Sequence, residues 1–136
     1  MGRVLIVEDN PTDIRNATAI LKTVGVPDAD VEAVRSVASA LVRLQDAVDG
    51  LQTPPYLLVL DLDFAHESGF EVLRFWRSNP KLKQTRIVVW TAMGDRQVEI
   101  SRLFGVDVVR KAGGTRDLDE SLRRYFPFAE QNFGAI

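Results

Sequence analysis

The chain has 136 residues, of which 46% are hydrophobic, and these values suit one packed domain. A formal net charge of −2, without any run of Lys or Arg, argues against a surface that binds nucleic acid or an anionic membrane. The absence of cysteine excludes disulfides, thiolate metal sites and cysteine nucleophiles. No apolar run approaches the roughly 18 residues of a membrane span and no signal-peptide core is present, so we expect a soluble, cytoplasmic protein.

Short apolar segments alternate with longer segments of helical periodicity along the chain. The strand-helix pairs are 4–7 with 11–24, 31–34 with 37–48, 56–60 with 69–79, 87–90 with 95–104, and 106–109 with 116–126. The first, third and fourth strands are continuously apolar, which is typical of parallel strands covered by helices on both faces. Five such units predict an α/β fold with a doubly wound parallel sheet.

Several predicted helices begin at capping residues. Asn10 offers an N-cap to the first helix, and Asp13 places an acid in its first turn. Ser68 and Glu71 have the spacing of a capping box, which predicts that both side chains bind free backbone amides at the start of the third helix. Thr115 is a candidate N-cap for the fifth helix.

Polar side chains follow four of the predicted strands where each strand ends. Glu8 and Asp9 follow the first strand, Asp61 the third, Thr91 the fourth and Lys111 the fifth. In open α/β sheets ligands bind outside the carboxyl ends of the strands, so we expect these side chains at one edge. Each alone has an ordinary structural explanation, as a helix cap, a strand threonine or a solvated lysine. Their joint position on one edge favours a functional site.

The carboxylates at this edge indicate a divalent cation. Mg²⁺ prefers oxygen ligands and is commonly held by one or two carboxylates together with phosphate oxygens and water. Without a cation, acids so close together would repel one another and raise a pKa. With a cation, Asp61 can attack phosphorus, while Lys111 supplies a positive charge and Thr91 a hydroxyl donor to the phosphoryl group.

Four segments resemble the receiver domain of two-component response regulators. They are VLIVEDN at the first strand, LLVLDLDFAHESGFEVL around Asp61, IVVWTA at the fourth strand and VVRKA at the fifth. The resemblance covers nearly the whole chain, from about Arg3 to Phe126. It implies a flavodoxin-like fold with strand order 2-1-3-4-5, formed by a receiver domain over residues 1–126 and followed by a tail of residues 127–136.

The resemblance also assigns roles to the polar residues at the strand ends. Asp61 would be the phosphoacceptor, and Thr91 and Lys111 would bind the phosphoryl group. The implied ligands of Mg²⁺ are Glu8, Asp9, Asp61 and the backbone carbonyl of Asp63.

By the same resemblance the protein is a stand-alone phosphoprotein switch of a two-component or phosphorelay pathway, not an enzyme beyond its own phosphotransfer and autodephosphorylation. A sensor histidine kinase or a histidine phosphotransfer protein would donate the phosphate. Because the chain carries no output domain, the output would be a contact with an unidentified target protein. The fourth helix, fifth strand and fifth helix would form the surface of a homodimer, and no direct contact with nucleic acid or membrane is expected.

Four positions depart from the usual receiver pattern. Ala112 replaces the proline that commonly follows the lysine, so the Lys111–Ala112 peptide is expected to be trans. Val108 stands where the family usually has a tyrosine or phenylalanine that responds to phosphorylation. Ala65 replaces a frequent loop proline, and Asp63 adds another carboxylate nearby. None of these changes removes a residue that phosphotransfer needs.

Two other functions fit parts of the sequence. Asp61-Leu62-Asp63 also resembles the first motif of haloacid-dehalogenase-type phosphatases, in which the first Asp is the nucleophile and the second the general acid/base. That family has its acidic pair after the lysine, whereas Glu8 and Asp9 come first here. Alternatively, the changes at Val108 and Ala112 would suit a degenerate receiver that never takes phosphate and acts only as a docking module.

Overall fold

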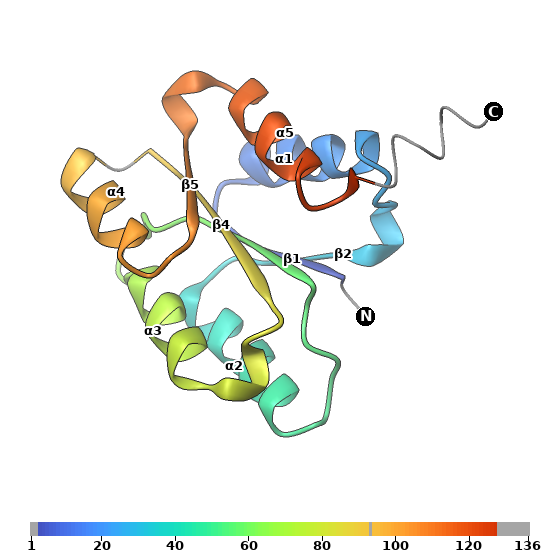
Figure 1. The fold of residues 1–136 in the computed structure, drawn as a ribbon, viewed down its shortest axis with the longest axis vertical. Coiled ribbons are helices and arrows are strands. Elements are labelled where there is room, and N and C mark those ends of the chain that lie inside the picture. Colours follow the sequence, from blue (N-terminus) through green and yellow to red (C-terminus); the bar gives the residue numbers. More distant parts are fainter. Residues whose placement is uncertain (1–2, 93, 128–136) are drawn as a thin grey trace.

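Five parallel strands form one sheet in the order β2-β1-β3-β4-β5 (Figure 1). The computed structural model describes residues 3–92 and 94–127. The strands are β1 Val4–Val7, β2 Val31–Val34, β3 Leu57–Leu60, β4 Arg86–Thr91 and β5 Asp107–Arg110. The predicted doubly wound α/β fold and its strand order are therefore confirmed.

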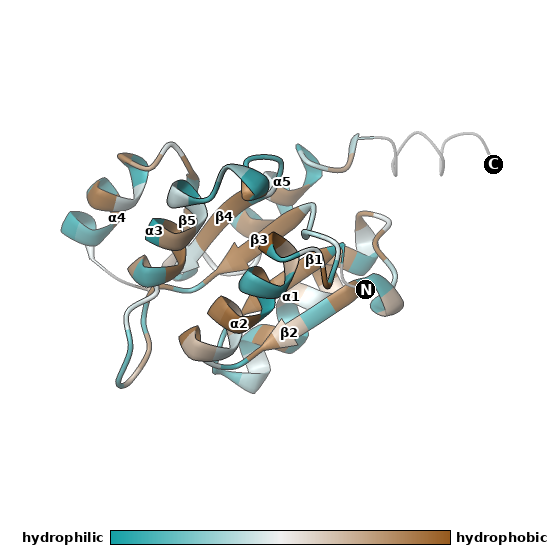
Figure 2. Ribbon diagram, turned by 90° about the horizontal axis from the view of Figure 1, so that it is seen from below, coloured by the Kyte–Doolittle hydropathy of each residue, from teal (hydrophilic) through white to brown (hydrophobic). Residues whose placement is uncertain are grey.

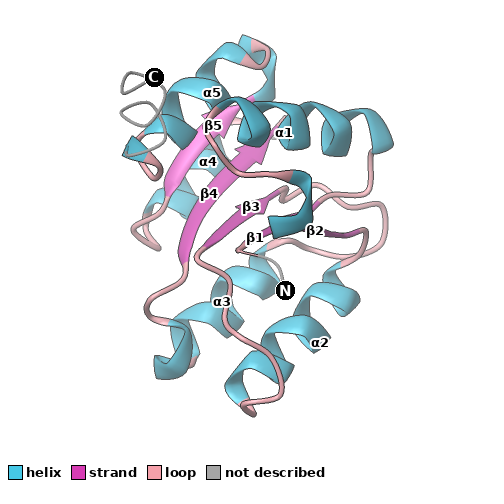
Figure 3. Ribbon diagram, turned by 90° about the vertical axis from the view of Figure 1, so that its right-hand side faces the viewer, coloured by secondary structure: helices cyan, strands magenta, loops and turns pink. Residues whose placement is uncertain are grey.

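Helices cover both faces of this sheet. They are α1 Pro11–Thr23, α2 Val37–Val48, α3 Phe70–Ser78, α4 Asp95–Arg102 and α5 Arg116–Arg123. Helices α1 and α5 lie together on one face, and α2 and α3 lie on the other (Figures 1 and 3). Helix α4 lies beside β5 at the edge of the sheet. Among the described residues no helix combines the length and the apolar character that crossing a membrane requires.

The central strands are buried on both faces because their side chains alternate between two apolar clusters. Leu5 and Val7 of β1 pack with α2 and α3, whereas Val4 and Ile6 pack with α1 and α5. In Figure 2 the central strands are largely brown, or hydrophobic, and the helices around them combine hydrophobic and hydrophilic residues. Burial of each such side chain contributes about 1.5–3 kcal/mol, so the sheet is a rigid support for residues at its edge.

The register of the strands sets the carboxyl edge of the sheet. Val7 of β1 is level with Leu60 of β3, and Leu60 is level with Val89 of β4. The Asp61 amide continues this ladder by donating to the Val7 carbonyl at 3.0 Å. Glu8 and Asp61 therefore leave the sheet as neighbours, since each is the residue directly after its strand.

One predicted cap is present in part and another is absent. The Ser68 half of the predicted capping box is present, because Ser68 Oγ accepts from the Phe70 amide at 3.3 Å, and Gly69, which precedes α3, already has helical backbone angles. The Glu71 half is absent, since this carboxylate pairs with Arg74 at 2.6 Å and not with the Ser68 amide. At the start of α5, Thr115 has the N-cap position but its side chain makes no capping hydrogen bond.

The fifth strand leads into a short 3-10 turn, Lys111–Gly113, that precedes α5. Its first peptide, between Lys111 and Ala112, is trans as predicted. The Val108 side chain is half-buried and packs against the apolar cluster that includes α2 and α3. Of the predicted tail, residues 128–136 lie outside the described part of the chain.

Candidate functional site

Glu8 is held in place by the turn that connects β1 to α1. Its side chain is only 2% exposed, and Oε2 accepts hydrogen bonds from the amides of Asp9, at 3.0 Å, and Asn10, at 3.2 Å. Asn10 in turn caps α1, since its Oδ1 accepts from the amides of Thr12 and Asp13 at 2.9 and 3.1 Å. The predicted N-cap is thus present, and it fixes both the carboxylate and the start of the helix.

Asp61 lies beside Glu8 at the end of β3. The residue is 5% exposed, and its Oδ1 accepts a hydrogen bond from the Asp63 amide at 3.2 Å. Asp63 itself is exposed and pairs with Ser68 through an isolated antiparallel bridge. The loop after β3 therefore folds back on itself and holds the Asp61 carboxylate in one orientation.

Three carboxylates converge at this point. Ligand atoms of Glu8, Asp9 and Asp61 all lie within 4.8 Å of one another. All of them are oxygens, the donor type that Mg²⁺ prefers, and the two buried members are already oriented by backbone hydrogen bonds. The donor set therefore fits a divalent cation such as Mg²⁺.

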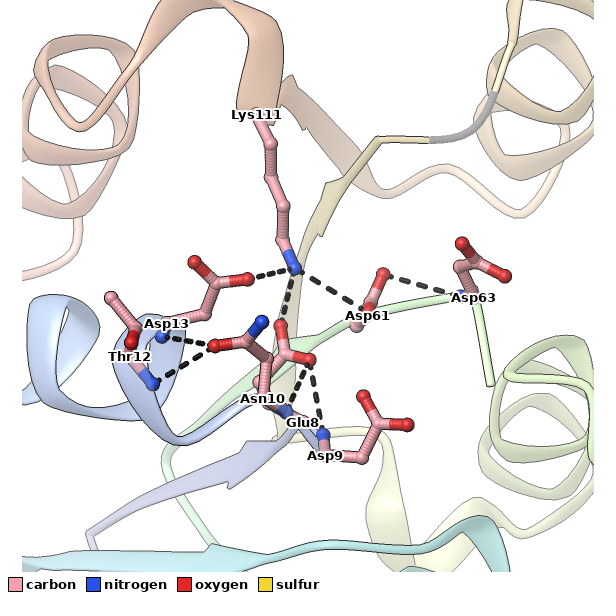
Figure 4. A network of polar contacts seen from close by, with 8 residues as sticks. All are labelled: Glu8, Asp9, Asn10, Thr12, Asp13, Asp61, Asp63 and Lys111. Atoms are coloured by element: carbon pink, nitrogen blue, oxygen red, sulfur yellow. Dashed lines mark hydrogen bonds and ion pairs between the residues drawn. The ribbon is translucent and has the colours of Figure 1, made fainter. Parts of the chain in front are cut away.

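Lys111 reaches into the same cluster from the turn after β5 (Figure 4). Its ammonium donates to Glu8 Oε1, to Asp13 Oδ2 at 2.8 Å and to Asp61 Oδ2 at 3.4 Å. The Lys111 Nζ atom also lies 5.0 Å from the centroid of the Trp90 ring, within cation–π range. One cation is therefore shared by three acids and an aromatic ring.

The electrostatics of the cluster follow from this shared charge. Burial raises the pKa of Glu8 to about 7; the charge of Asp61 adds to the increase, and the hydrogen bond from Lys111 opposes it. For Lys111, burial acts to lower the pKa, but the hydrogen bonds to Asp13 and Glu8 outweigh burial and raise the pKa above its usual value. One ammonium leaves a net negative charge on the three carboxylates, which a bound cation would offset.

Thr91 is the last residue of β4 and is fully buried. Since Val89 is level with Leu60, Thr91 lies beyond Asp61 at the carboxyl edge of the neighbouring strand. The structure thus places Glu8, Asp9, Asp61, Thr91 and Lys111 at one edge of the sheet. Their chemical roles, and that of the Asp63 carbonyl, stay predictions.

Sequence reasoning missed two residues that matter at this edge. Asp13 pairs with Lys111, although its position in the first turn of α1 indicated only a favourable helix charge. Glu67 extends from the loop after β3 and accepts hydrogen bonds from the amides of Val37 and Ala38 at 3.0 and 3.1 Å. It therefore ties that loop to the start of α2, a contact that no local pattern indicates.

Comparison with known proteins finds a response regulator and a chemotaxis protein as relatives. No protein-family model matches the chain. The response regulator Rcp1 of Synechocystis sp. is 35% identical over 89 residues, which are 65% of this chain and 60% of that protein. The chain thus spans less than two thirds of that relative, and only 38% of the chemotaxis protein CheV1 of Helicobacter pylori, which is 24% identical.

Solved structures extend the similarity over most of the fold. The phosphorylated cyanobacterial phytochrome response regulator RcpA is 26% identical with a TM-score of 0.75, covering 90% of this chain and 91% of that one. The Mn²⁺-bound form of Rcp1 is 30% identical with a TM-score of 0.70, covering 88% of each chain. Both the sheet and its helices are therefore shared with response regulators.

Proposed function

The chain belongs to the receiver-domain family of response regulators, and from this membership we propose that it is a switch in which Asp61 accepts a phosphoryl group. The observation that carries the proposal is the convergence of an oxygen-only ligand set and a lysine on one buried carboxylate. Ligand atoms of Glu8, Asp9 and Asp61 lie within 4.8 Å of one another, and Lys111 Nζ lies 3.4 Å from Asp61 Oδ2.

In the proposed reaction a carboxylate oxygen of Asp61 attacks the phosphorus atom of the donor. The new P–O bond forms as the donor's bond to phosphorus breaks, and the electron pair of the broken bond stays on the donor. Lys111 would pair with a phosphoryl oxygen, and Thr91 would donate its hydroxyl to another. Glu8, Asp9, Asp61 and the Asp63 carbonyl would hold Mg²⁺, which would neutralise charge on the phosphoryl oxygens.

The proposed donor is a sensor histidine kinase or a histidine phosphotransfer protein in the cytoplasm. Two findings support such a pathway: the sequence similarity to Rcp1 and the structural similarity to RcpA, which was solved in a phosphorylated form. We assign the receiver domain to residues 1–126. Its output would be a contact with a target protein, or a homodimer through the surface of α4, β5 and α5, favoured by a shift between two conformations.

Intact-protein mass spectrometry after incubation with acetyl phosphate and Mg²⁺ tests the proposal. We expect wild type to gain one phosphoryl group and to lose this ability with EDTA, and Asp61→Asn to gain none. Free phosphate is measured in the same samples. Continuous release over many turnovers that Asp63→Asn abolishes would instead indicate a phosphatase. If wild type stays unmodified both with acetyl phosphate and with a histidine kinase as donor, the protein is better described as a degenerate docking module.

A further inference from the structure

Lys111 forms ion pairs with three carboxylates, of which two are also candidate cation ligands and one is not. Glu8 and Asp61 belong to the cation ligand set, and their oxygens would also serve the metal. Asp13 lies outside that set, on the first turn of α1, and its contact of 2.8 Å is shorter than the 3.4 Å contact to Asp61. The Asp13 contact is therefore the one of these three with which cation binding does not compete.

The Asp13 carboxylate is well placed to hold an ammonium group. Its backbone amide is fixed by the Asn10 cap, and its side chain is 25% exposed while that of Lys111 is 16% exposed. Partial burial strengthens the ion pair, since water screens it less than it screens a surface pair. Figure 4 shows the Lys111 ammonium between Asp13 on one side and Asp61 on the other.

We propose that Asp13 is a positioning residue that restrains Lys111 in the unphosphorylated protein, so that the ammonium must give up this partner when it pairs with a phosphoryl group on Asp61. The inference rests on the proposed function of Asp61. It follows from a thermodynamic rule: any contact made only in one of two states shifts the equilibrium toward that state. Asp13 therefore weakens the response to phosphorylation by stabilising the resting position of Lys111.

Beryllofluoride, which mimics a phosphoryl group on aspartate, tests the restraint at saturating Mg²⁺. We expect Asp13→Asn to bind it roughly two- to tenfold more tightly than wild type, the range that corresponds to the net contribution of one ordinary hydrogen bond. The matched control is Asp119→Asn on α5, which removes one carboxylate from another 2.8 Å ion pair, with Arg123. This control should bind like wild type, and melting curves verify that each variant is folded.

A double-mutant cycle separates the restraint from a simple loss of negative charge. In a Lys111→Met background, Asp13→Asn should no longer tighten beryllofluoride binding, because the restrained group is absent. Equal tightening in both backgrounds would show that Asp13 acts by general repulsion, and this result overturns the proposal. Weaker binding by Asp13→Asn in the wild-type background would overturn it as well.

Trp90 supplies a readout that needs no phosphorylation. The Lys111 ammonium lies 5.0 Å from its ring centroid, so Trp90 fluorescence reports the position of that group. In a Trp76→Phe background we expect Asp13→Asn to change the Trp90 emission in the resting protein and Asp119→Asn to leave it unchanged. Unchanged emission in Asp13→Asn would refute the restraint. If the emission changes but wild type does not accept phosphate, only the proposed function is refuted.

Discussion

A Cβ atom on Gly69 would lie 2.5 Å from the carbonyl oxygen of Asp61 and 2.6 Å from the Cα atom of Leu62. The Gly69 amide donates to the Leu62 carbonyl at 3.2 Å, so the loop after β3 closes backbone against backbone. Both atoms belong to the main chain and cannot rotate away. The start of α3 and the proposed phosphoacceptor are therefore in direct contact, and only glycine leaves room for it.

We predict that Gly69→Ala lowers the free energy of unfolding by about 1–3 kcal/mol, because the loop must shift to admit the methyl group. The same shift would move Asp61 and slow its phosphorylation by acetyl phosphate. Gly113→Ala is the control, since its Cβ would meet only the Asp117 side chain, which can rotate. Chemical denaturation measures both variants, and equal stability of the two would contradict the prediction.

The pKa of Glu8 predicts an unusual pH dependence of stability in the metal-free protein. Burial raises this pKa from 4.5 to about 7, so the folded state binds a proton that the unfolded state has already lost. Stability contributed by this proton is complete below about pH 4.5 and is lost as the pH rises to about 7. We expect Glu8→Gln to remove this loss.

Urea denaturation in EDTA across pH 4.5–8 measures the effect as the difference in unfolding free energy between wild type and Glu8→Gln. As the pH rises to about 7, wild type should lose stability relative to Glu8→Gln. Above about pH 7 the difference in unfolding free energy should stay constant. A difference that does not vary with pH would show that Glu8 is ionised throughout this range.

Glu67, which lies in the loop after β3, should stabilise the start of α2. Its carboxylate accepts from the amides of Val37 and Ala38, whereas Ser36, the N-cap, accepts from Ser39. We predict that Glu67→Ala costs about 0.5–2 kcal/mol, as loss of a helix cap does, and that Glu67→Gln costs less. Hydrogen exchange by NMR should show faster exchange at the Val37 and Ala38 amides.

The control for this prediction is Glu71→Ala, which removes a nearby exposed acid that pairs only within α3, with Arg74. It should leave exchange at the start of α2 unchanged. Unaltered exchange in Glu67→Ala would mean that the contact with α2 contributes nothing in solution.

Arg43 is a buried cation whose main partner is Glu32. Its side chain is 4% exposed, its Nε donates to both Glu32 oxygens, and its Nη2 donates to the Thr53 carbonyl at 2.9 Å. Removing one member of a buried pair leaves the other charge without compensation. We predict that Glu32→Gln lowers stability by about 2 kcal/mol or more.

Adding Arg43→Met to Glu32→Gln should recover part of that loss, because the uncompensated charge disappears. Thermal denaturation measures the single and double variants. Arg43 lies on α2 and Glu32 on β2, and their hydrogen bonds are to each other and to Thr53, so phosphorylation should proceed at the wild-type rate. A double variant less stable than Glu32→Gln would contradict this explanation.

The sheet and most of the site could be predicted from the sequence because their signals are local. Continuous apolar runs indicate parallel strands buried on both faces, and a residue directly after such a run lies at the carboxyl edge. This reasoning predicts that Glu8, Asp61 and Lys111 lie together, and in the structure Lys111 donates to both carboxylates. Only half of the predicted capping box is present: Ser68 accepts from the Phe70 amide, whereas Glu71 pairs with Arg74, a choice between partners that spacing alone does not decide.

The amino-acid sequence by itself determined the α/β class, the strands and the identity of the polar residues at the strand ends. Only the tertiary structure decided which partners those residues have. Lys111 meets Asp13 across 98 positions of the chain, and Glu67 meets the start of α2 across about 30. Such contacts depend on how packed helices and loops approach one another, and hydrophobic periodicity fixes the buried face of an element without fixing its neighbours.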